Sequence, residues 1–286
     1  MIEFSIIILN YNTKELLKNC LTSVIQFTKK INYEIIVVDN ASSDGSEKEI
    51  RQLFKQVIWI QNKNNFGFAK ANNIGIKKAK GKFVILLNSD TKIESDAFTK
   101  LVEFANKKNS LGIAGPRLLN ADKTPQPSVA PFYTLPITAI SLFHGDRFLR
   151  QSPNTSQKVD WVTGACFIIN RQLIEKIGLL DEHYFMYIEE MEYCYRAKKA
   201  GFTVWYFPEV DVYHLVRGSS PEGKQKVIWW IYEGLQYFYE KHFAPWQLSM
   251  LKLLLRFKAA VYWFVGVVLG NQYLRQTYAQ AYGLVK

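Results

Sequence analysis

The chain contains a five-residue apolar run, residues 83–87, that leads into Asn88, Ser89 and Asp90. A short apolar run of this kind is typical of a strand that is buried on both faces. Burying an unpaired carboxylate costs several kcal/mol or more, so Asp90 is expected at the mouth of that strand. In an open parallel sheet, ligands bind at the carboxyl ends of the strands. Asp90 is therefore either a solvated strand end or a ligand for a metal ion.

Three other groups of polar residues also follow apolar segments. They are Asn10-Tyr11-Asn12, Asp39-Asn40 and Asn64-Asn65-Phe66-Gly67. One such group is routine for a turn, but four groups at the ends of parallel strands are expected to converge on one crevice. The glycines do not follow the G-x-G-x-x-G spacing of dinucleotide-binding folds, and the sequence has no P-loop motif. Both of those nucleotide-binding classes are therefore disfavoured.

Strand and helix patterns alternate up to about residue 115, and these elements would position the polar groups. Strands are expected at 4–9, 34–39, 57–61 and up to residue 90, with helices near 14–27, 46–54, 68–80 and 95–108. Ser46 and Glu49 form a potential capping box, and Ser95 is a potential cap for the last helix. Such alternation predicts an α/β fold with a mostly parallel central sheet flanked by helices.

The alternating pattern breaks at Pro116, and residues 116–160 have the composition of a long insertion. Loops of that length are usually functional or mobile, and a small hairpin is expected over 118–126. Beyond the insertion, the sequence predicts a strand at 161–170, helices near 171–177 and 187–200, and short strands at 203–207 and 211–213. Gly201 is well placed to end the second of these helices.

After residue 224 the chain is dominated by aromatic and aliphatic residues interrupted by Lys and Arg. The longest uncharged apolar run there, residues 259–269, is shorter than the roughly 20 residues needed to cross a bilayer. Two interpretations remain open. The segment forms amphipathic helices that lie on a membrane surface, which we favour, or helices that pack on the core or on a second copy.

The composition indicates anionic partners and a reducing compartment. Thirty-six Lys and Arg against 25 Asp and Glu give a net charge of +11, which suits nucleotides, diphosphates or acidic lipid, or only keeps the surface solvated. No nucleic-acid-binding motif is present, so nucleic acid is not expected as a partner. The three cysteines are odd in number and lack metal-ligand spacing. Without a secretion signal at the start, a cytoplasmic location is expected.

Taken together, the motifs resemble the inverting family-two glycosyltransferases of the GT-A fold. The matching segments are 5–12, 37–46, 65–75, 86–91, 162–166 and 181–196, followed by His214 and Gly218-Ser219. The insertion that begins Pro116-Arg117-Leu118-Leu119-Asn120 resembles the rhamnosyltransferase-like branch. The resemblance implies a catalytic domain over 1–223, with a nucleotide-binding half at 1–115 and an acceptor half at 116–223. The C-terminal helices would occupy 224–286.

The resemblance also implies a divalent metal, Mg²⁺ or Mn²⁺, that neutralises a leaving diphosphate. Asp90 matches the last carboxylate of the D-x-D element, Asn88 replaces the first carboxylate, and His214 matches a second metal ligand. Gly67 would let the backbone approach the nucleotide, and Trp161 would either wall the sugar site or belong to the core. The residues implied in donor binding are Asn10, Tyr11, Asn12, Asp39, Asn65, Gly67, Asn72, Asn88, Trp161, Gly164, Arg217 and Ser219.

Glu190 takes the position of the family's catalytic Asp, and Glu189 is the second candidate for the general base. On a helix, Glu192 and Arg196 lie on one side by their four-residue spacing and are expected to pair. Glu190 points elsewhere, with Cys194 and Ala197. This separation favours Glu190 as the base, whereas the alternative is that acidic residues simply favour the first turn of a helix.

The implied activity is transfer of one sugar, L-rhamnose from a dTDP donor or a hexose from a UDP donor. The acceptor would be a lipid-linked or cell-surface glycan, and the enzyme would work at the inner face of the cell membrane, with a homodimer left open. A processive polysaccharide synthase is an alternative, although no Q-x-x-R-W element is present. A non-catalytic nucleotide-sugar or glycan binder at the membrane surface is the alternative from another class.

Overall fold

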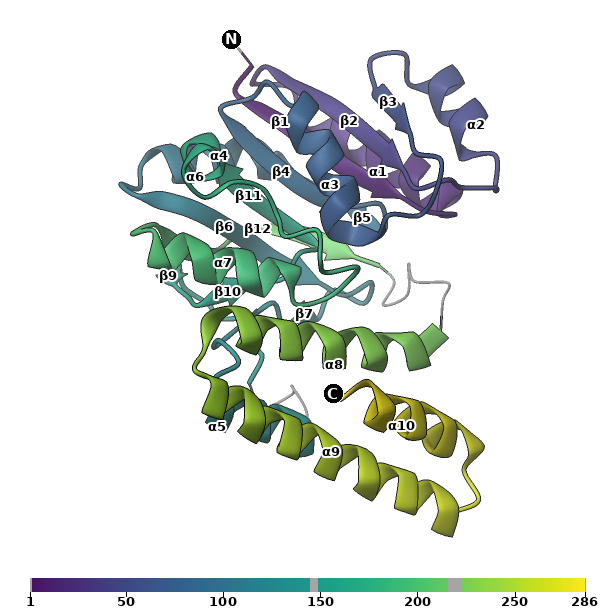
Figure 1. The fold of residues 1–286 in the computed structure, drawn as a ribbon. Helices are drawn as coiled ribbons and strands as arrows, with labels where there is room; N and C mark the ends of the chain where they lie inside the picture. The colour runs from purple at the N-terminus through teal and green to yellow at the C-terminus, as the bar shows by residue number, and fades with distance from the viewer. Residues whose placement is uncertain (1, 145–148, 216–222, 286) are drawn as a thin grey trace.

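A ten-stranded mixed sheet forms the centre of the computed structural model, which describes residues 2–144, 149–215 and 223–285 (Figure 1). The main path of the sheet has the order β3-β2-β1-β4-β11-β6-β12-β5. Its strands are β1 (Phe4–Asn10), β2 (Tyr33–Asp39), β3 (Ile58–Gln61), β4 (Phe83–Asn88), β5 (Thr91–Lys92), β6 (Leu111–Leu119), β11 (Cys166–Asn170) and β12 (Thr203–His214). The short strands β7 (Pro125–Gln126) and β9 (Gln157–Lys158) pair with β6 and β12. The predicted α/β class with a mostly parallel sheet is therefore confirmed.

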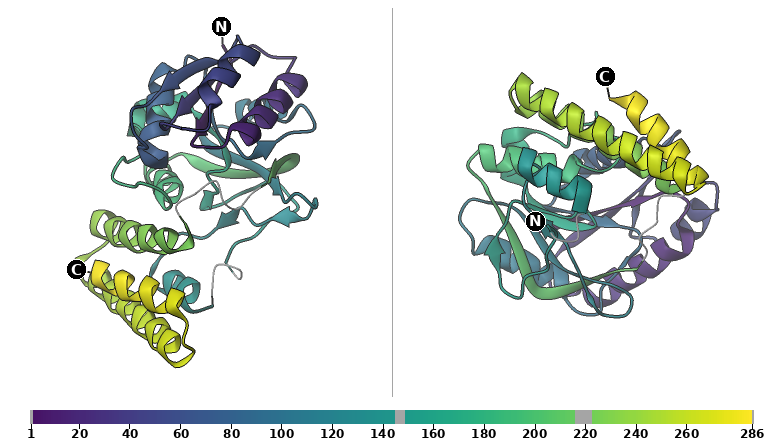
Figure 2. Two further views of the ribbon diagram at one scale, coloured as in Figure 1. Left: turned by 90° about the vertical axis from the view of Figure 1, so that its right-hand side faces the viewer. Right: turned by 90° about the horizontal axis from the view of Figure 1, so that it is seen from below.

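Helices cover both faces of the sheet because successive strand residues point to opposite sides. In β1, Ile6 and Ile8 belong to one apolar cluster and Ile7 belongs to the other. The first face is covered by α1 (Lys14–Phe27), α2 (Ser46–Leu53) and α4 (Ala97–Asn106). The second face carries α3 (Gly67–Lys78), α6 (Arg171–Ile177) and α7 (Glu189–Lys199). Beyond α7 lie α8 (Gly223–His242), α9 (Pro245–Val268) and α10 (Gln272–Leu284), with α5 (Leu135–His144) beside α9 (Figures 1 and 2).

Strand register aligns the polar residues at one edge of the sheet. The parallel pairing of β1, β2 and β3 places Asn10, Asp39 and Gln61 in one row. β4 pairs on the other side of β1, with Leu9 opposite Asn88. β12 is antiparallel to β5, and His214 lies opposite Thr91, the residue after Asp90. The expected convergence of strand ends thus follows from the hydrogen-bonded register itself.

Both predicted N-terminal helix caps were wrong, whereas Gly201, with a φ of 88°, follows the end of α7 as expected. Ser46 is the first residue of α2 rather than its cap, and the preceding Gly45 takes a left-handed φ of 82°. The carboxylate of Asp44 accepts hydrogen bonds from the backbone N–H groups of Ser46 (3.0 Å) and Lys14 (2.8 Å), so it serves the first turns of two helices. Helix α4 begins after Asp96, not Ser95, and has no side-chain cap.

The second half contains more regular structure than the sequence predicted. β6 continues through Pro116 to Leu119, and the hairpin with β7 is confirmed. The expected strand at 161–170 is split into β10 (Trp161–Val162), which pairs with β8 (Val129–Ala130), and β11. The two short strands expected at 203–213 are one strand, β12, with an irregularity between Phe207 and Asp211. The insertion also holds the ten-residue helix α5.

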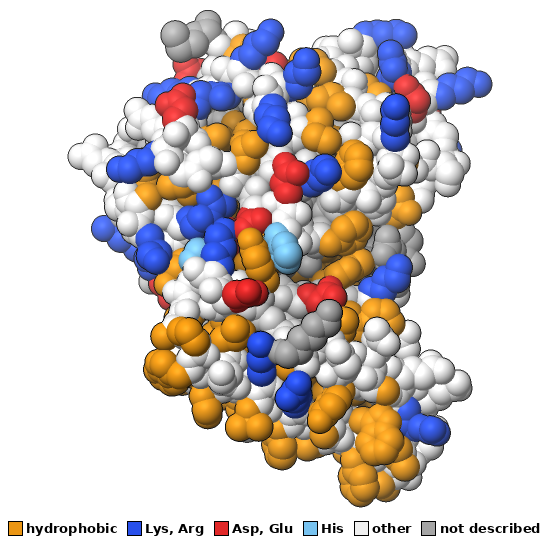
Figure 3. All heavy atoms as spheres, in the orientation of Figure 1, with side chains coloured by type: hydrophobic (Ala, Val, Ile, Leu, Met, Phe, Trp, Pro, Cys, Tyr) orange, Lys and Arg blue, Asp and Glu red, His pale blue; other side chains and the backbone are white. Residues whose placement is uncertain are grey.

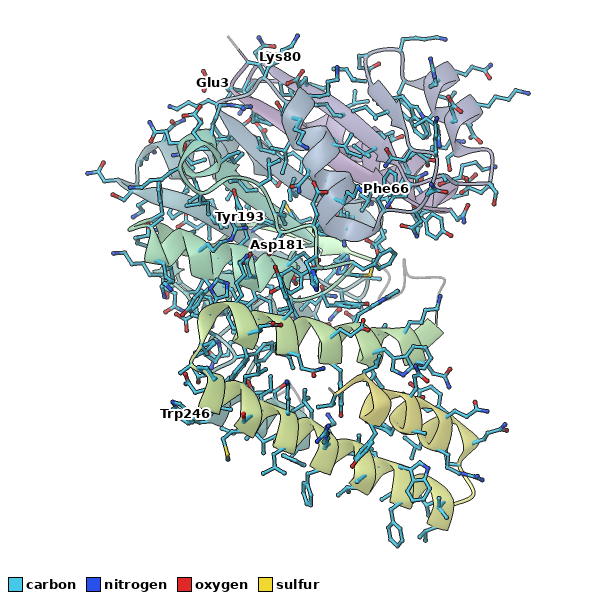
Figure 4. The ribbon with its side chains drawn as sticks, in the orientation of Figure 1. Glu3, Phe66, Lys80, Asp181, Tyr193 and Trp246 are labelled. Carbon is cyan, nitrogen blue, oxygen red and sulfur yellow. The ribbon has the colours of Figure 1, made fainter. Side chains whose placement is uncertain are left out.

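The C-terminal helices pack on the core through α8, whose Leu235 and Phe238 belong to the same apolar cluster as β1 and α7. The outer helix α9 carries an exposed apolar stripe at three- and four-residue spacing, which we call the α9 stripe: Trp246, Met250, Leu253, Phe257, Val261, Phe264 and Val268. Figure 3 shows apolar side chains across this lower part of the molecule, and Figure 4 places Trp246 near one end of α9. Among the described residues, no helix has the length and hydropathy that crossing a bilayer requires.

A buried ion cluster fastens α8 to α7. Glu192 is fully buried, and its Oε1 lies 2.9 Å from Arg196 Nε, 2.8 Å from Lys241 Nζ and 3.0 Å from His242 Nε2. The expected Glu192–Arg196 pair is therefore confirmed. Burial opposes ionisation, but the hydrogen bond from His242 and the charges of Arg196 and Lys241 outweigh it and lower the pKa of Glu192. Asp181, labelled in Figure 4, adds a second contact to Lys241 at 2.6 Å.

We expect Glu192→Gln to lower the free energy of unfolding by about 3–5 kcal/mol, because breaking a buried ion pair leaves its partner charges uncompensated. A pKa that is lower in the folded state stabilises the fold above the ordinary value of 4.5 and loses that effect as the pH falls. The difference between the variant and wild type should therefore shrink in acid. Urea unfolding at several pH values measures it, with the surface variant Glu47→Gln as the control. Equal stability of Glu192→Gln and wild type at neutral pH would contradict this role.

Candidate active site

Asp39 organises the first part of the site, at the carboxyl end of β2. Its Oδ1 accepts hydrogen bonds from Asn10 Nδ2 and Ser42 Oγ, both at 2.6 Å. Its Oδ2 accepts from the Ser42 backbone N–H at 2.8 Å and from Gln61 Nε2 at 2.6 Å. The carboxylate is 1% exposed and fully engaged within the chain. Asp39 thus holds together the ends of β1, β2 and β3. The sequence did not single out Gln61 as part of this cluster.

Tyr11 and Asn12 form the outer rim of this cluster. Asn12 is exposed and has a φ of 53°, and its backbone N–H donates to Ser42 Oγ at 2.8 Å. In return, Asn12 Oδ1 accepts from the Ser43 backbone N–H at 2.8 Å. Tyr11 is half-buried next to it. The loops after β1 and β2 are therefore tied together before any ligand binds.

Asn65 and Gly67 lie at the start of α3. Asn65 Oδ1 accepts from the Gly67 backbone N–H at 2.9 Å and from Asn40 Nδ2 at 3.1 Å. Gly67 has a φ of 75°, and a Cβ there would lie 2.2 Å from the carbonyl oxygen of Phe185. The structure thus gives a different reason for the glycine from the one expected: it allows close packing on the Phe185 backbone.

Asn72 and its neighbour Asn73 are both buried in α3. The Asn72 amide donates to the Phe68 carbonyl at 2.9 Å, so it is used within its own helix. Asn73, which the sequence did not single out, exchanges two hydrogen bonds with the Leu180 backbone at 2.8 and 3.1 Å. Asn73 thereby holds the segment before α7 against α3.

Asp90 is 0% exposed, and within the described ranges neither of its side-chain oxygens has a hydrogen-bond partner. His214 Nε2 lies 3.3 Å from Asp90 Oδ1. A buried carboxylate left in this condition is costly unless a positive charge compensates it. Carboxylate oxygen and imidazole nitrogen are suitable donors for Mn²⁺, and carboxylate oxygen for Mg²⁺. The pair therefore fits a divalent metal ion.

Gln126 fixes the orientation of His214, and the sequence did not predict this role. Gln126 Nε2 donates to Asn120 Oδ1 at 3.0 Å, which turns Gln126 Oε1 toward His214 Nδ1 at 2.7 Å. Because a carbonyl oxygen only accepts, Nδ1 carries a proton, and Nε2 on the opposite side of the ring faces Asp90. No group of three or more His, Cys, Asp or Glu able to hold a metal occurs in the described part of the chain. Phosphate oxygens and water would have to complete the coordination.

Short hydrogen bonds connect the three parts of the site. Thr13 Oγ1 donates to Asn10 Oδ1 at 2.7 Å and lies 2.8 Å from Ser89 Oγ, next to Asp90. On the other side, the backbone N–H of half-buried Asn88 donates to the Ala165 carbonyl at 2.9 Å. Ala165 follows Gly164 in the chain, and Gly164 lies beside Glu190 in the first turn of α7. The Asp39 cluster, Asp90 and α7 therefore belong to one connected edge.

Glu190 lies in the first turn of α7 beside Gly164. A Cβ built on Gly164 would lie 3.5 Å from Glu190 Cβ, in ordinary van der Waals contact, so this position adjoins the Glu190 side chain. The turn before α7 is unusual, because Tyr187 and Ile188 both have positive φ, 69° and 73°. Left-handed backbone costs an L-residue about 1–2 kcal/mol, most for a β-branched one. Such strain at the start of a helix is characteristic of functional sites.

Glu190 also lines a cavity of about 250 Å³ between α7 and the C-terminal helices. Trp161 forms part of its wall, with its indole N–H bonded to the Pro131 carbonyl at 3.0 Å. The guanidinium of Arg150, a residue that the sequence did not single out, lies 4.9 Å from the Trp161 ring centre. Trp161 is 2% exposed, as a core residue would be, and it also lines the cavity shared with Glu190.

The two adjacent glutamates differ in their electrostatics. Burial, reinforced by the charge of Glu190, holds the pKa of Glu189 well above its ordinary value. Burial also raises the pKa of Glu190, but backbone N–H groups, including that of Gly164, and the charge of Arg150 oppose the shift. One oxygen of each carboxyl is buried without a hydrogen-bond partner among the residues that the structure describes. Glu190 is therefore the one of the pair that ionises more readily.

Arg217 and Ser219, expected near the diphosphate, lie outside the described residues. The remaining expected residues fall into three neighbouring groups: the Asp39 cluster with its rim, the Asp90–His214 pair, and Glu190 with Gly164 and Trp161. Asn72 is the exception, since its amide turns into α3.

Comparison with known proteins places these groups in a wider context. Residues 5–178 match the family described as glycosyl transferase family 2. The chain is 32% identical to the low-salt glycan biosynthesis hexosyltransferase Agl10 of Haloferax volcanii, over 74% of this chain and 67% of that protein. It is 24% identical to the N-acetylglucosaminyl-diphospho-decaprenol L-rhamnosyltransferase of Mycobacterium tuberculosis, over 63% and 66%. It is 25% identical to the dTDP-rhamnosyl transferase RfbF of Shigella flexneri, over 75% and 69%.

A solved structure supports the fold. GalNAc-T7 with UDP, GalNAc and Mn²⁺ superposes with a TM-score of 0.60 at 20% identity, covering 84% of this chain and 50% of that chain. At that identity the likeness concerns the fold alone. The chain spans about two thirds of the length of the three curated relatives.

Proposed function

The chain belongs to glycosyl transferase family 2, and we propose that it is an inverting, metal-dependent transferase that moves one sugar from a nucleotide donor to a glycan acceptor. The observation that carries this proposal is a pair of carboxylates connected through Asn88 and the Ala165–Gly164 backbone: buried Asp90, without a hydrogen-bond partner in the described chain, and Glu190, of raised pKa. Asp90 suits a metal ion and the diphosphate that it would hold, and Glu190 suits proton transfer.

The donor nucleoside would bind at the rim formed by Asn10, Tyr11 and Asn12. Asp39 would act there chiefly by holding Asn10 and Ser42 in place, because all its hydrogen bonds are already made within the chain. The printed names of two relatives support rhamnose as the sugar, and one names a dTDP donor. The hexosyltransferase relative supports a hexose, from a UDP donor, as the other choice.

Asp90 and His214 would hold the metal, Mg²⁺ or Mn²⁺, with Gln126 setting the histidine tautomer. When bound, that ion would neutralise the charge that develops on the departing diphosphate. Asn88 contributes no charge, so Asp90 is the only carboxylate that this motif offers the ion. The donor's own phosphates would therefore make a large share of the coordination.

Glu190 would serve as the general base. An acceptor hydroxyl attacks the anomeric carbon as the bond from that carbon to the diphosphate oxygen breaks, and the hydroxyl proton passes to Glu190. A base works best when its pKa lies near the working pH, and burial moves the pKa of Glu190 in that direction. Glycine at 164 leaves space beside the carboxylate for the reacting groups.

We further propose that the α9 stripe lies on an anionic membrane surface. The stripe is long, regular and exposed, with Phe257 59% and Phe264 61% accessible. Lys252 and Arg256 interleave with it on the same helix, which suits acidic headgroups around an embedded apolar face. A second copy of the chain is the competing occupant.

Glu190→Gln should lower kcat by a factor of about 10²–10⁴ while leaving the donor-induced rise in Tm intact. In wild type, kcat/KM should rise with pH through the raised pKa of Glu190, because the base must be ionised. The acid limb should therefore lie above 4.5, the ordinary glutamate value. Transfer assays measure both effects, with exposed Glu175→Gln as the control. Full transfer by Glu190→Gln would exclude it as the base, and loss of donor binding would point to misfolding.

Asp90→Asn should abolish the stabilisation that Mn²⁺ and a nucleoside diphosphate together give to wild type. In chelator, the same variant should be at least as stable as wild type, because it removes an uncompensated buried charge. Thermal unfolding with and without Mn²⁺ measures both. An undiminished Mn²⁺-dependent shift in the variant would refute Asp90 as a ligand.

Phe257→Ser and Phe264→Ser together should reduce co-sedimentation with anionic vesicles by about tenfold or more, because they remove two large apolar side chains from the stripe. Neutral vesicles and the paired substitution of exposed Leu53 and Ile58 to Ser serve as controls. Unchanged vesicle binding would contradict the membrane assignment. A shift from dimer to monomer in light scattering would assign the stripe to a second copy instead.

A further inference from the structure

The 250 Å³ cavity beside Glu190 has a wall of unusual composition. Helices α5, α7, α8, α9 and α10 contribute to it, and eleven of its fifteen lining residues are aliphatic or aromatic. Two cationic residues enter this lining from distant parts of the chain: Arg150 from the segment after α5, and Lys258 from α9. Glu190 is its acidic member.

Two cations in a mostly apolar wall favour an anionic ligand. Charge–charge attraction is several times stronger at such a site than in bulk water, and guanidinium and ammonium groups bind phosphate oxygens through charge-assisted hydrogen bonds. A neutral sugar would gain little from either charge. Arg150 is positioned for this role, since its guanidinium stacks over Trp161 at 4.9 Å.

The outer surfaces of the same wall elements are apolar. In α5, Ser141 and Leu142 line the cavity, whereas Ile140 and Phe143 are exposed. In α9, Lys258 lines the cavity, whereas Phe257 is exposed and lies 5.8 Å from Phe143 between ring centres. A chain that leaves the cavity past α5 and α9 would therefore meet the α9 stripe.

We propose that this cavity binds the phosphate-bearing end of a lipid-linked glycan acceptor. Arg150 and Lys258 contact the phosphate oxygens, the aromatic wall contacts the adjoining sugar, and the lipid leaves over α5 and α9. This assignment rests on the proposed function and names its acceptor class: a lipid phosphate or diphosphate rather than a free glycan. It also explains why Glu190 opens into the cavity, because the acceptor hydroxyl must reach that carboxylate.

Binding of an isoprenyl diphosphate tests the assignment without depending on turnover. Farnesyl diphosphate, farnesol and inorganic pyrophosphate are titrated into the full chain and followed by calorimetry. Arg150→Gln and Lys258→Gln should each weaken farnesyl diphosphate by about tenfold or more, the loss of one charged contact. Farnesol binding should change by less than about twofold. Lys100→Gln, which changes an exposed lysine of α4 outside the cavity lining, should behave as wild type.

Three outcomes would overturn the assignment: farnesyl diphosphate that does not bind wild type, binding that neither substitution weakens, or pyrophosphate that binds as tightly as the lipid diphosphate. Circular dichroism of each variant excludes misfolding. The proposed function fails in a different way. If wild type binds farnesyl diphosphate through both cations but transfers no sugar from any dTDP or UDP donor, the lipid-phosphate site stands and the transfer reaction does not.

Discussion

The carboxylate of Asp90 sets the main constraint on this structure, because it is removed from water without a hydrogen-bond partner in the described chain. A protein tolerates such a group only where a positive charge can reach it. The surrounding elements are arranged for that purpose: β12 pairs with β5 so that His214 faces Asp90, and Gln126 turns the ring. The neighbouring strand ends carry further polar side chains, which hydrogen bonds hold in place at the same end of the sheet.

Five acidic positions, four of them buried and Glu190 half-buried, show how environment divides the work among chemically similar groups. Asp39 is saturated by hydrogen bonds and holds loops together. Glu192 is saturated by cations and holds helices together. Asp90 and the Glu189–Glu190 pair retain unsatisfied oxygens. Because unsatisfied buried polar atoms are rare in folded proteins, the open oxygens of Asp90, Glu189 and Glu190 distinguish these carboxylates from Asp39 and Glu192.

The sequence predicted whatever depends on local pattern. Apolar runs located β1, β2 and β4, and the four-residue spacing located the Glu192–Arg196 pair. Prediction from the sequence failed where contacts between residues far apart in the chain determine the structure. Gly67 is explained by Phe185, more than a hundred residues away, and β6 tolerates Pro116 because neighbouring strands hold it in the sheet. Gln126 and Arg150 gave no signal, since their importance arises only when the 116–160 segment folds against β12 and α7.

The ion cluster around Glu192 bears on how this protein can evolve. Lys241 and His242 come from the C-terminal segment, whereas Glu192 and Arg196 come from the helix that also carries Glu190. The C-terminal segment is therefore not an independent unit that could be removed without affecting α7. Exchanging it between relatives, or trimming it after Gly223, would leave a buried anion with only Arg196 as its partner beside the reacting groups. Positions 192, 241 and 242 should therefore change together or not at all, so that the C-terminal helices and the orientation of α7 are inherited as one unit.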